Sequence, residues 1–228
     1  IPRTLALSCF GDMDVSTIDE MPPGRGTVDT HFLRPYQWQE AFDKTRQELQ
    51  KGNRAFVIYP LVEENEELDL TSATEAYEEL RETKFSDFNC CLMHGQMPPE
   101  EKRRAMEGFR NGDYRVMIAT TVVEVGIDVP EATAMIIQHA ERLGLSQLHQ
   151  LRGRIGRGGE HGSCFLLADP RTEESTERLE VISNTSDGFE IAEGAPHPTD
   201  VDGGDVPATV VDWLESTVAS ETDAEVSA

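Results

Sequence analysis

A run of arginine, glutamine and glycine residues is the segment of the chain best equipped for chemistry. It reads Gln-Leu-His-Gln-Leu-Arg-Gly-Arg-Ile-Gly-Arg and extends from Gln147 to Arg157. Arg154 and Arg157 lie three positions apart, so a helix that continued this far would present both guanidinium groups on one face. A guanidinium group forms paired hydrogen bonds with phosphate oxygens, and Gly153 and Gly156 would leave that face open to a ligand. The pattern favours phosphate binding over the alternative of a solvated basic helix end.

A second segment combines hydroxyl groups, a glycine and a carboxylate directly after an apolar run. Thr120 and Thr121 end the run, and Gly126 and Asp128 follow them. Ligands of open α/β sheets collect at the carboxyl ends of strands, which is where these side chains are expected. The threonine hydroxyls suit nucleic-acid phosphates, and the carboxylate suits a ribose hydroxyl group. An ordinary strand-turn-helix connection, with threonine as a helix cap, explains the same segment equally well.

Histidines and cysteines carry weaker signals. His94 and Gly95 follow another apolar run, where a histidine is a capping or packing residue about as often as a binding residue. His149 precedes the arginines on a predicted helix, and we expect it to pack there rather than to act in catalysis, because no nucleophile accompanies it. The cysteines form no Cys-x-x-Cys pair and have no histidine at metal-ligand spacing, so we expect free thiols and no metal site. They are Cys9, Cys90, Cys91 and Cys164.

These segments need a scaffold, and the hydrophobic pattern predicts one. Between residues 27 and 169, short β-branched runs alternate with longer runs of helical period, which is typical of βα units on a mostly parallel sheet flanked by helices. We expect strands at 54–59, 89–93, 115–119, 134–138 and 163–167. We expect helices at 36–51, 71–84, 99–111 and 146–154, with prolines 98 and 99 at a tolerated helix start.

Composition divides the chain into three parts. Proline and glycine punctuate residues 12–35, so we assign a linker there and place residues 1–20 at the end of a preceding domain, so that residues 1–26 comprise that end and the linker. Residues 27–186 form the predicted α/β domain. Residues 187–228 hold 11 carboxylates and no lysine or arginine, which predicts a disordered acidic tail. The chain is therefore expected to be cut from something longer.

The overall charge excludes one class of protein. Lysine and arginine total 20 against 43 aspartate and glutamate residues, for a net charge of −23, so this is not a basic nucleic-acid tail protein. Hydrophobic residues make up 38% of the chain, but no uninterrupted apolar stretch approaches the roughly 18 residues of a membrane helix. We expect a cytoplasmic protein with no membrane partner.

The motifs resemble those of a known family. Gln150-x-x-Gly153-Arg154-x-x-Arg157 is similar to motif VI of superfamily 2 helicases, and residues 120–128 are similar to motif V. More wording agrees: Ile-Pro-Arg-Thr-Leu-Ala at 1–6, Asp-Met-Asp-Val-Ser-Thr-Ile-Asp-Glu-Met-Pro-Pro-Gly-Arg at 12–25, Met-His-Gly at 93–95 and Ser-Asp-Gly-Phe-Glu-Ile-Ala at 186–192. Over residues 1–193 the chain resembles the RecG family of bacterial ATP-dependent DNA helicases, which remodel stalled replication forks and branched recombination intermediates.

The resemblance implies a RecA-like helicase C-terminal domain, the second of two motor domains. ATP with Mg²⁺ would bind between the two, and the first domain would supply the P-loop and the metal ligands. Arg154 and Arg157 would act as arginine fingers. Beside the nucleotide would lie Gln150, Gly126, Asp128 and Gly153. The DNA contacts would come from Thr120, Thr121, His94 and Gly95.

Departures from the family pattern limit what the chain is expected to do alone. No Gly-x-x-x-x-Gly-Lys-Ser/Thr sequence occurs, and Met-Pro rather than a helicase signature follows Asp19-Glu20. The isolated chain is therefore expected to be inactive as an ATPase. Its implied partners are forked or branched DNA and the first RecA-like and wedge domains of the same full-length protein.

Two alternatives to this function stay open at this point. One is the motor of a transcription-repair coupling translocase, which shares the Gln-Leu-x-Gln-Leu-Arg-Gly-Arg wording. The linker wording at 12–25 favours RecG over it. The other is a non-catalytic helicase-like binding module, which a P-loop encoded upstream of Ile1 would exclude.

Overall fold

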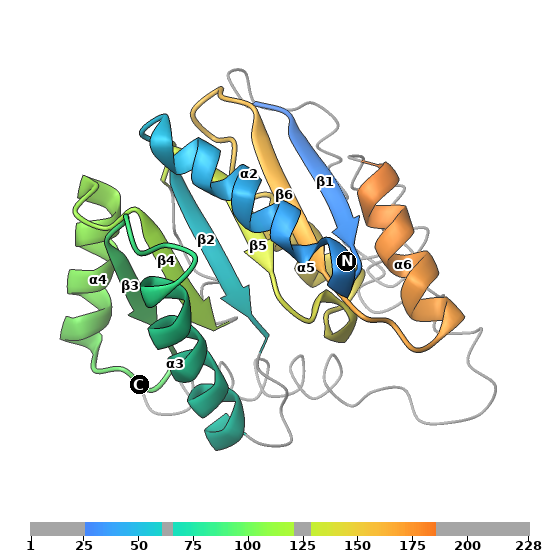
Figure 1. Ribbon diagram of the computed structural model, residues 1–228, viewed down its shortest axis with the longest axis horizontal. Helices are drawn as coiled ribbons and strands as arrows, with labels where there is room; N and C mark the ends of the chain where they lie inside the picture. The colour runs from blue at the N-terminus through green and yellow to red at the C-terminus, as the bar shows by residue number, and fades with distance from the viewer. Residues whose placement is uncertain (1–25, 61–65, 121–128, 186–228) are drawn as a thin grey trace, which may run out of the picture. The chain divides into compact units, whose positions relative to one another are not determined.

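Short apolar runs form six strands of one parallel sheet in the described part of the chain. The computed structural model describes residues 26–60, 66–120 and 129–185. Its strands are β1 (Val28–Leu33), β2 (Arg54–Tyr59), β3 (Cys90–Met93), β4 (Val116–Thr120), β5 (Ala132–Ile137) and β6 (Gly162–Leu167). Their order across the sheet is β1-β6-β5-β2-β4-β3, and every neighbouring pair is parallel (Figure 1). All six strands therefore end at the same edge of the sheet.

Helices connect these strands and cover both faces of the sheet. They are η1 (Pro35–Gln37), α2 (Trp38–Gln50), α3 (Glu66–Glu82), α4 (Pro99–Asn111), η2 (Ala140–Arg142), α5 (Leu145–Arg152) and α6 (Glu173–Asn184). The apolar residues of α2 and α3 pack on one face, and those of α4, α5 and α6 pack on the other. Figure 1 shows α2 and α3 in front of the sheet. The result is a three-layer α/β domain.

The central strand β2 shows why these residues form a sheet core. Its side chains alternate between the two layers, with Phe56 and Ile58 on the side of α4 to α6 and Ala55 and Val57 on the side of α2 and α3. The Phe56 ring meets the Phe109 ring of α4 at a centroid distance of 4.9 Å. A strand covered on both faces reads as a continuous apolar run rather than an alternating one.

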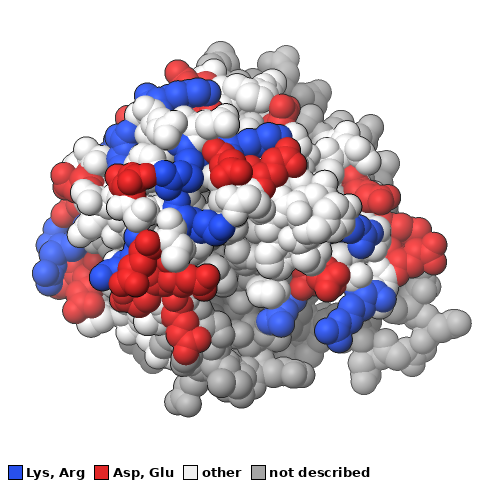
Figure 2. Space-filling view, viewed as in Figure 1, with Lys and Arg blue, Asp and Glu red and all other residues white. Residues whose placement is uncertain are grey.

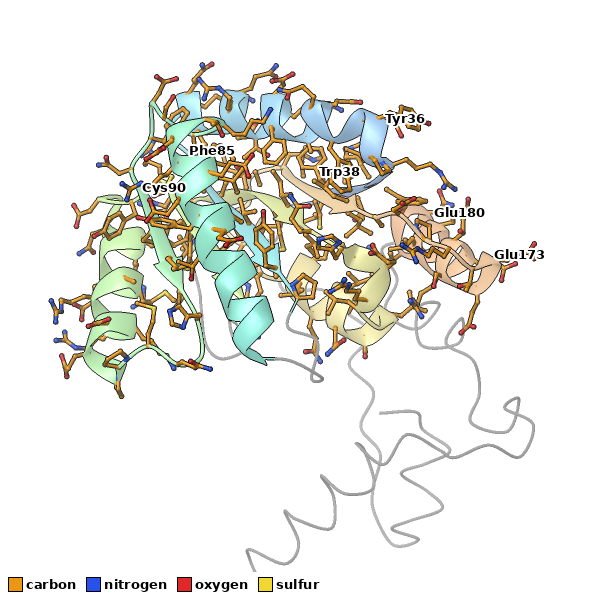
Figure 3. All side chains as sticks on the ribbon, turned by 60° about the horizontal axis from the view of Figure 1, so that its bottom comes forward. Tyr36, Trp38, Phe85, Cys90, Glu173 and Glu180 are labelled. Carbon is orange, nitrogen blue, oxygen red and sulfur yellow. The ribbon has the colours of Figure 1, made fainter. Side chains whose placement is uncertain are left out.

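Aromatic side chains mark where the core ends. Phe85 is fully buried in the layer of α2 and α3, close to the Phe42 ring at 6.0 Å. Tyr36 is the large apolar exception within the described ranges, with 82% of its surface exposed just before α2 (Figure 3). Acidic and basic side chains mingle on the face seen in Figure 2. No helix among the described residues is long and apolar enough to span a membrane.

The structure confirms the predicted fold class and most predicted elements. The helix predicted at 99–111 has those bounds, and Pro98 and Pro99 stand at its start. The strand predicted at 54–59 is likewise β2, and the other four predicted strands differ from the observed ones by one or two residues at their ends. Thiols of Cys90, Cys91 and Cys164 are free, and burial raises their pKa values to about 11, about 12 and about 12.

Three predicted segments have wrong boundaries, and one helix was not predicted. The linker predicted over 12–35 contains β1, because a parallel partner, β6, takes up this half-polar run. Helix α6 follows Thr172, whose hydroxyl accepts a hydrogen bond from the Ser175 N–H as an N-cap, and it was not predicted. Helix α3 begins five residues before the predicted start, and α5 ends at Arg152 rather than at residue 154. Residues 1–25, the tail at 187–228 and Cys9 lie outside the described ranges.

Candidate functional site

The sequence-predicted site residues divide between opposite edges of the sheet. Thr120 is the last residue of β4, and His94 directly follows β3, so both lie at the edge where strands end. The arginine-bearing loop, residues 153–161, lies at the edge where strands begin. There the Gly156 N–H donates to the Ala132 carbonyl at 3.0 Å, at the start of β5. We call these the carboxyl edge and the amino edge.

At the amino edge, α5 ends before both arginines. Gly153 caps the helix, and turns follow in which the Arg154 N–H donates to the Leu151 carbonyl at 2.9 Å. Arg154 is half-buried, whereas Arg157 is exposed and its Nε donates to the Gly153 carbonyl at 3.0 Å. The helix does not continue far enough to place both guanidinium groups on one helical face, and a folded loop carries them instead.

Gly156 has a backbone conformation that is not helical. Its φ of +71° lies in the left-handed region that favours glycine. It is also buried, and a Cβ there would meet the Val28 side chain at 3.1 Å. The prediction that Gly156 leaves a bare face for a ligand is wrong, because this glycine packs against β1. Its place in the motif is structural.

A third arginine in the same run ties α5 to α6. Arg152 is 6% exposed, and its Nη1 donates to the carbonyls of Ile182 at 3.0 Å and Thr185 at 2.7 Å. Its Nη2 donates to His149 Nδ1 at 2.9 Å. A cation at carbonyls that end a helix is favourable both as hydrogen-bond donor and as charge. His149 thus has the packing role that we expected.

Sequence reasoning missed Arg152 although a signal was present. Leu148, Leu151 and Arg152 are buried at helical spacing, so Arg152 lies on the inward face of α5. An arginine within an apolar helical stripe needs buried acceptors, because leaving a buried charge unpaired is costly. That requirement predicts a neighbouring helix whose last carbonyl groups accept hydrogen bonds from Arg152, but it does not identify the helix.

At the carboxyl edge, two buried polar atoms lack partners. Met93 of β3 is in register with Ala119 of β4, which brings His94 beside Thr120. Thr120 is fully buried, and neither its Oγ1 nor His94 Nδ1 has a hydrogen-bond partner within the described ranges. Buried polar atoms are nearly always hydrogen-bonded in proteins, so such exceptions require an explanation. Thr120 Oγ1 caps no described helix.

Burial also affects the charge state at this edge. Burial lowers the pKa of His94 below its usual 6.5, and nearby Lys102 lowers it further against the opposing effect of Glu101. Lys102 also donates to the Gly95 carbonyl and so anchors the turn after β3. At the end of β2, burial raises the pKa of Tyr59 to about 12, so its phenol stays protonated. The buried groups His94 and Tyr59 thus favour their neutral forms, while the charged Lys102 and Glu101 lie nearby.

The remaining predicted residues contribute less to the described site. Gln150 is exposed on α5 near the arginines, whereas Thr121, Gly126 and Asp128 lie in 121–128, outside the described ranges. Guanidinium groups suit the oxygens of a nucleotide polyphosphate, so the amino edge fits that part of ATP. The described residues contain no cluster of three acidic, histidine or cysteine side chains that could hold Mg²⁺.

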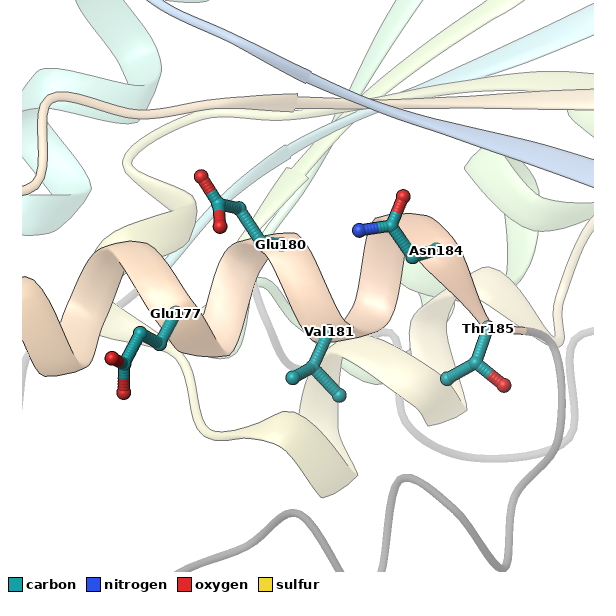
Figure 4. A pocket seen from close by; sticks show the side chains of 5 residues that line it. All are labelled: Glu177, Glu180, Val181, Asn184 and Thr185. Carbon is teal, nitrogen blue, oxygen red and sulfur yellow. The ribbon is translucent and has the colours of Figure 1, made fainter.

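A hollow of about 550 Å³ runs beside α6 (Figure 4). Its lining residues belong to α6 and its C-cap: Glu177, Glu180, Val181, Asn184 and Thr185. Carboxylates repel phosphate groups, so this hollow does not suit a nucleotide or a nucleic-acid backbone.

Comparisons with known proteins agree on the family. The model of the helicase conserved C-terminal domain matches residues 40–159. The ATP-dependent DNA helicase RecG of Thermotoga maritima is 49% identical over 193 residues, which are 85% of this chain and 25% of that protein. RecG of Aquifex aeolicus is 52% identical over 198 residues, with the same two shares. The chain spans about a quarter of the length of these relatives.

Solved structures give the same result. A structure of RecG bound to a three-way DNA junction matches with a TM-score of 0.72 and 47% identity, over 85% of this chain and 25% of that one. Saccharomyces cerevisiae Dbp5 bound to RNA and ADP BeF3 matches with a TM-score of 0.54 and 18% identity, over 96% of this chain and 51% of that one. This likeness shows the shared fold alone. The chain belongs to the helicase conserved C-terminal domain family, and the cited relatives and solved structure that it matches at 47–52% identity are RecG proteins.

Proposed function

We propose that this domain is the second motor domain of an ATP-dependent DNA helicase that remodels stalled replication forks and other branched DNA. The observation that carries the proposal is the 47% identity, over 85% of the chain, to RecG bound to a three-way DNA junction. The cited relatives are RecG helicases, which favours this function over that of a transcription-repair coupling translocase.

Arg154 and Arg157 act on the nucleotide from the amino edge. ATP with Mg²⁺, held against the first RecA-like domain, supplies the phosphoryl group that is transferred to water. The two guanidinium groups stabilise the negative charge that this group develops, and a positioned arginine can do so without reorganisation during the reaction. Other residues placed beside the nucleotide are Gln150, Gly153, Gly126 and Asp128.

DNA binds at the carboxyl edge. The Thr120 hydroxyl is a hydrogen-bond donor that lacks a partner within the described ranges. A phosphate oxygen of DNA would accept its hydrogen bond. His94 and Gly95 lie beside it, and Thr121 follows it in the chain. Contacts to phosphates position a protein on DNA without reading its sequence, which suits an enzyme that recognises DNA by its branching.

The sheet links the two edges. Strand β4 ends in Thr120, and its neighbour β2 pairs in turn with β5, whose first residue, Ala132, bonds to the arginine-bearing loop. Because this core is buried and close-packed, the domain moves as one body. Closure on ATP at one edge therefore displaces the DNA contacts at the other, and repeated cycles move the enzyme along DNA.

A paired assay tests both halves of the proposal. In a full-length helicase carrying this chain, Arg154→Ala should abolish ATP hydrolysis stimulated by forked DNA and leave DNA binding intact. Thr120→Val should weaken DNA binding and leave the maximal rate of hydrolysis nearly unchanged. Glu107→Gln, on the exposed outer face of α4, serves as a control for both measurements.

Two results would reject the proposal. If the full-length protein hydrolyses no ATP with any DNA, the domain is a non-catalytic binding module. If it hydrolyses ATP but prefers linear duplex to forked DNA and displaces a stalled RNA polymerase, the coupling-translocase function replaces the one proposed.

A further inference from the structure

We propose that the chain just before and within β1 is a clamp that positions the arginine-bearing loop for nucleotide hydrolysis. The entry clamp consists of Gly26, Thr27, Asp29 and His161. Its positioning residues are Gly26 and His161, which contact neither of the proposed ligands themselves. The inference rests on the proposed function of Arg154 and Arg157 and adds residues to it from a different part of the chain.

Backbone hydrogen bonds join the clamp to both sides of the loop. The Gly26 N–H donates to the Gly156 carbonyl at 2.8 Å, and the Gly162 N–H donates to the Thr27 carbonyl at 2.8 Å. Gly156 also donates to Ala132, as described above, so both polar groups of its backbone are engaged. The point held most firmly therefore lies between Arg154 and Arg157 in sequence.

Gly26 allows this contact because it has no side chain. A Cβ at this position would lie 1.9 Å from the Glu160 carbonyl oxygen and 3.1 Å from that of Gly156. Real Cβ atoms do not approach backbone this closely, so any side chain would push the loop away from β1. The close approach fixes the loop at van der Waals distance.

A side-chain bridge completes the clamp. His161 Nε2 lies 2.9 Å from Asp29 Oδ2, and His161 Nδ1 lies 2.9 Å from Thr27 Oγ1. A carboxylate only accepts, so Nε2–H is the donor to Asp29, and the Thr27 hydroxyl donates to Nδ1. Glu160, which precedes His161 in the chain, is attracted by Lys51.

Position matters strongly for groups that stabilise a transition state. A misplacement of about 1 Å in a catalytic group can cost about a hundredfold in rate. Arg154 and Arg157 lie two residues and one residue from Gly156, so a shift of Gly156 moves both.

Two graded variants in the full-length helicase test the clamp. Gly26→Ala should lower kcat for ATP by about 10- to 100-fold, since it displaces the loop backbone. His161→Ala should lower kcat by a smaller factor, about 3- to 10-fold, because its bridge is exposed and water competes for it. KM for ATP should change little in both, since the loss falls on the transition state.

Three further variants make the result specific. His161→Gln keeps an amide N–H near the place of Nε2, so it should recover part of the loss through Asp29. Glu107→Gln removes a pair to Arg103 of similar exposure on α4 and should leave kcat unchanged. Arg154→Ala reports separately on the proposed function. Amide hydrogen exchange in the 228-residue chain should show faster exchange at Gly156 and Gly162 after His161→Ala.

The outcomes separate the two proposals. If Arg154→Ala abolishes hydrolysis while Gly26→Ala and His161→Ala leave kcat at the wild-type value, the clamp is wrong and the proposed function stands. A rise of KM at unchanged kcat would also overturn the clamp. If Gly26→Ala unfolds the domain, His161→Ala and its glutamine rescue decide. If Arg154→Ala leaves kcat unchanged, the proposed function itself fails.

Discussion

The two edges of the sheet differ in how their polar groups are hydrogen-bonded. At the amino edge the arginine-bearing loop is held by backbone hydrogen bonds to β1 and β5 and by a glycine with no space for a side chain. At the carboxyl edge Thr120 Oγ1 and His94 Nδ1 are buried and have no partner among the described residues. At the amino edge the backbone groups of Gly156 are satisfied, although Arg54 Nε at the start of β2 is buried without a partner among the described residues, and at the carboxyl edge two side-chain atoms are left unsatisfied.

This difference separates two ways of preparing a site. A group that must stabilise developing charge works best when the protein has already fixed its position, which the amino edge does. A group that must bind and release a moving strand needs an unsatisfied donor that the strand can engage in passing. The carboxyl edge bears the cost of that donor whenever it is empty, because an unpaired buried polar group is unfavourable.

The largest expected effect is on kcat for ATP when an arginine of the amino edge is removed. Arg154→Ala or Arg157→Ala in the full-length helicase should lower kcat for ATP by about 10³- to 10⁵-fold, or about 4–7 kcal/mol of transition-state stabilisation. Lysine should rescue poorly, because a point charge does not reproduce the guanidinium fork. Steady-state ATP hydrolysis with saturating forked DNA measures it. A raised KM at wild-type kcat would instead assign these arginines to ground-state binding.

A smaller effect is expected where α5 meets α6. Arg152→Ala removes the donors to the Ile182 and Thr185 carbonyls and should lower the free energy of unfolding by about 1.5–3 kcal/mol. Urea unfolding of the 228-residue chain measures it. Arg104→Ala, exposed on α4, should change the same quantity by less than about 0.5 kcal/mol. Equal losses in the two variants would mean that Arg152 has no special role.

At the carboxyl edge, a substitution that keeps or raises the stability of the domain should lower its affinity for DNA. Thr120→Val replaces a hydroxyl that has no partner among the described residues with a methyl group, so the free energy of unfolding should stay constant or rise by up to about 1 kcal/mol. DNA affinity, measured by fluorescence anisotropy with the full-length helicase, should fall.

Thr120→Ser is the matched variant for that experiment. It keeps the hydroxyl and loses a buried methyl group, so it should bind DNA normally and be less stable than wild type. If the valine variant is the less stable of the two, the hydroxyl has a partner and the contrast between the edges disappears.

The smallest effect concerns pH. His94 has its pKa lowered from 6.5 by burial, so as pH falls the unfolded chain takes up this proton before the folded domain does. The contribution of His94 to stability is therefore present above about pH 6.5 and is lost as pH falls below it. A DNA phosphate beside His94 should raise its pKa again. The Hε1 chemical shift, followed against pH with and without forked DNA, tests this, and no change on DNA binding would place His94 outside the interface.

Sequence patterns predicted the helices and strands that are specified by their own residues, without help from distant parts of the chain. β2 is a continuous apolar run, and α4 begins at two prolines, so both have the predicted bounds. β1 was missed because its half-polar run follows a proline- and glycine-rich segment, and its strand identity depends on pairing with β6. Spacing alone could not supply that information.

Contacts with distant residues also limited the prediction of the candidate site. The residue types of motif VI were recognised, but the conformation that carries Arg154 and Arg157 was not. The left-handed turn at Gly156 is imposed by contact with Gly26 and Val28, which lie far away in the chain. Likewise, the unpartnered state of Thr120 Oγ1 depends on how the strands around it pack, and no residue type encodes it.

The pairing of β1 with β6 also has a consequence for the order of folding. Thr27 and His161 are separated by 134 positions, and β1 has no other strand neighbour in the described sheet. Contacts between such distant residues form late, because closing a long loop costs entropy before any contact repays it. We therefore expect β1 to pair only after β6 has formed, and the arginine-bearing loop, which β1 holds, to take its final shape late in folding.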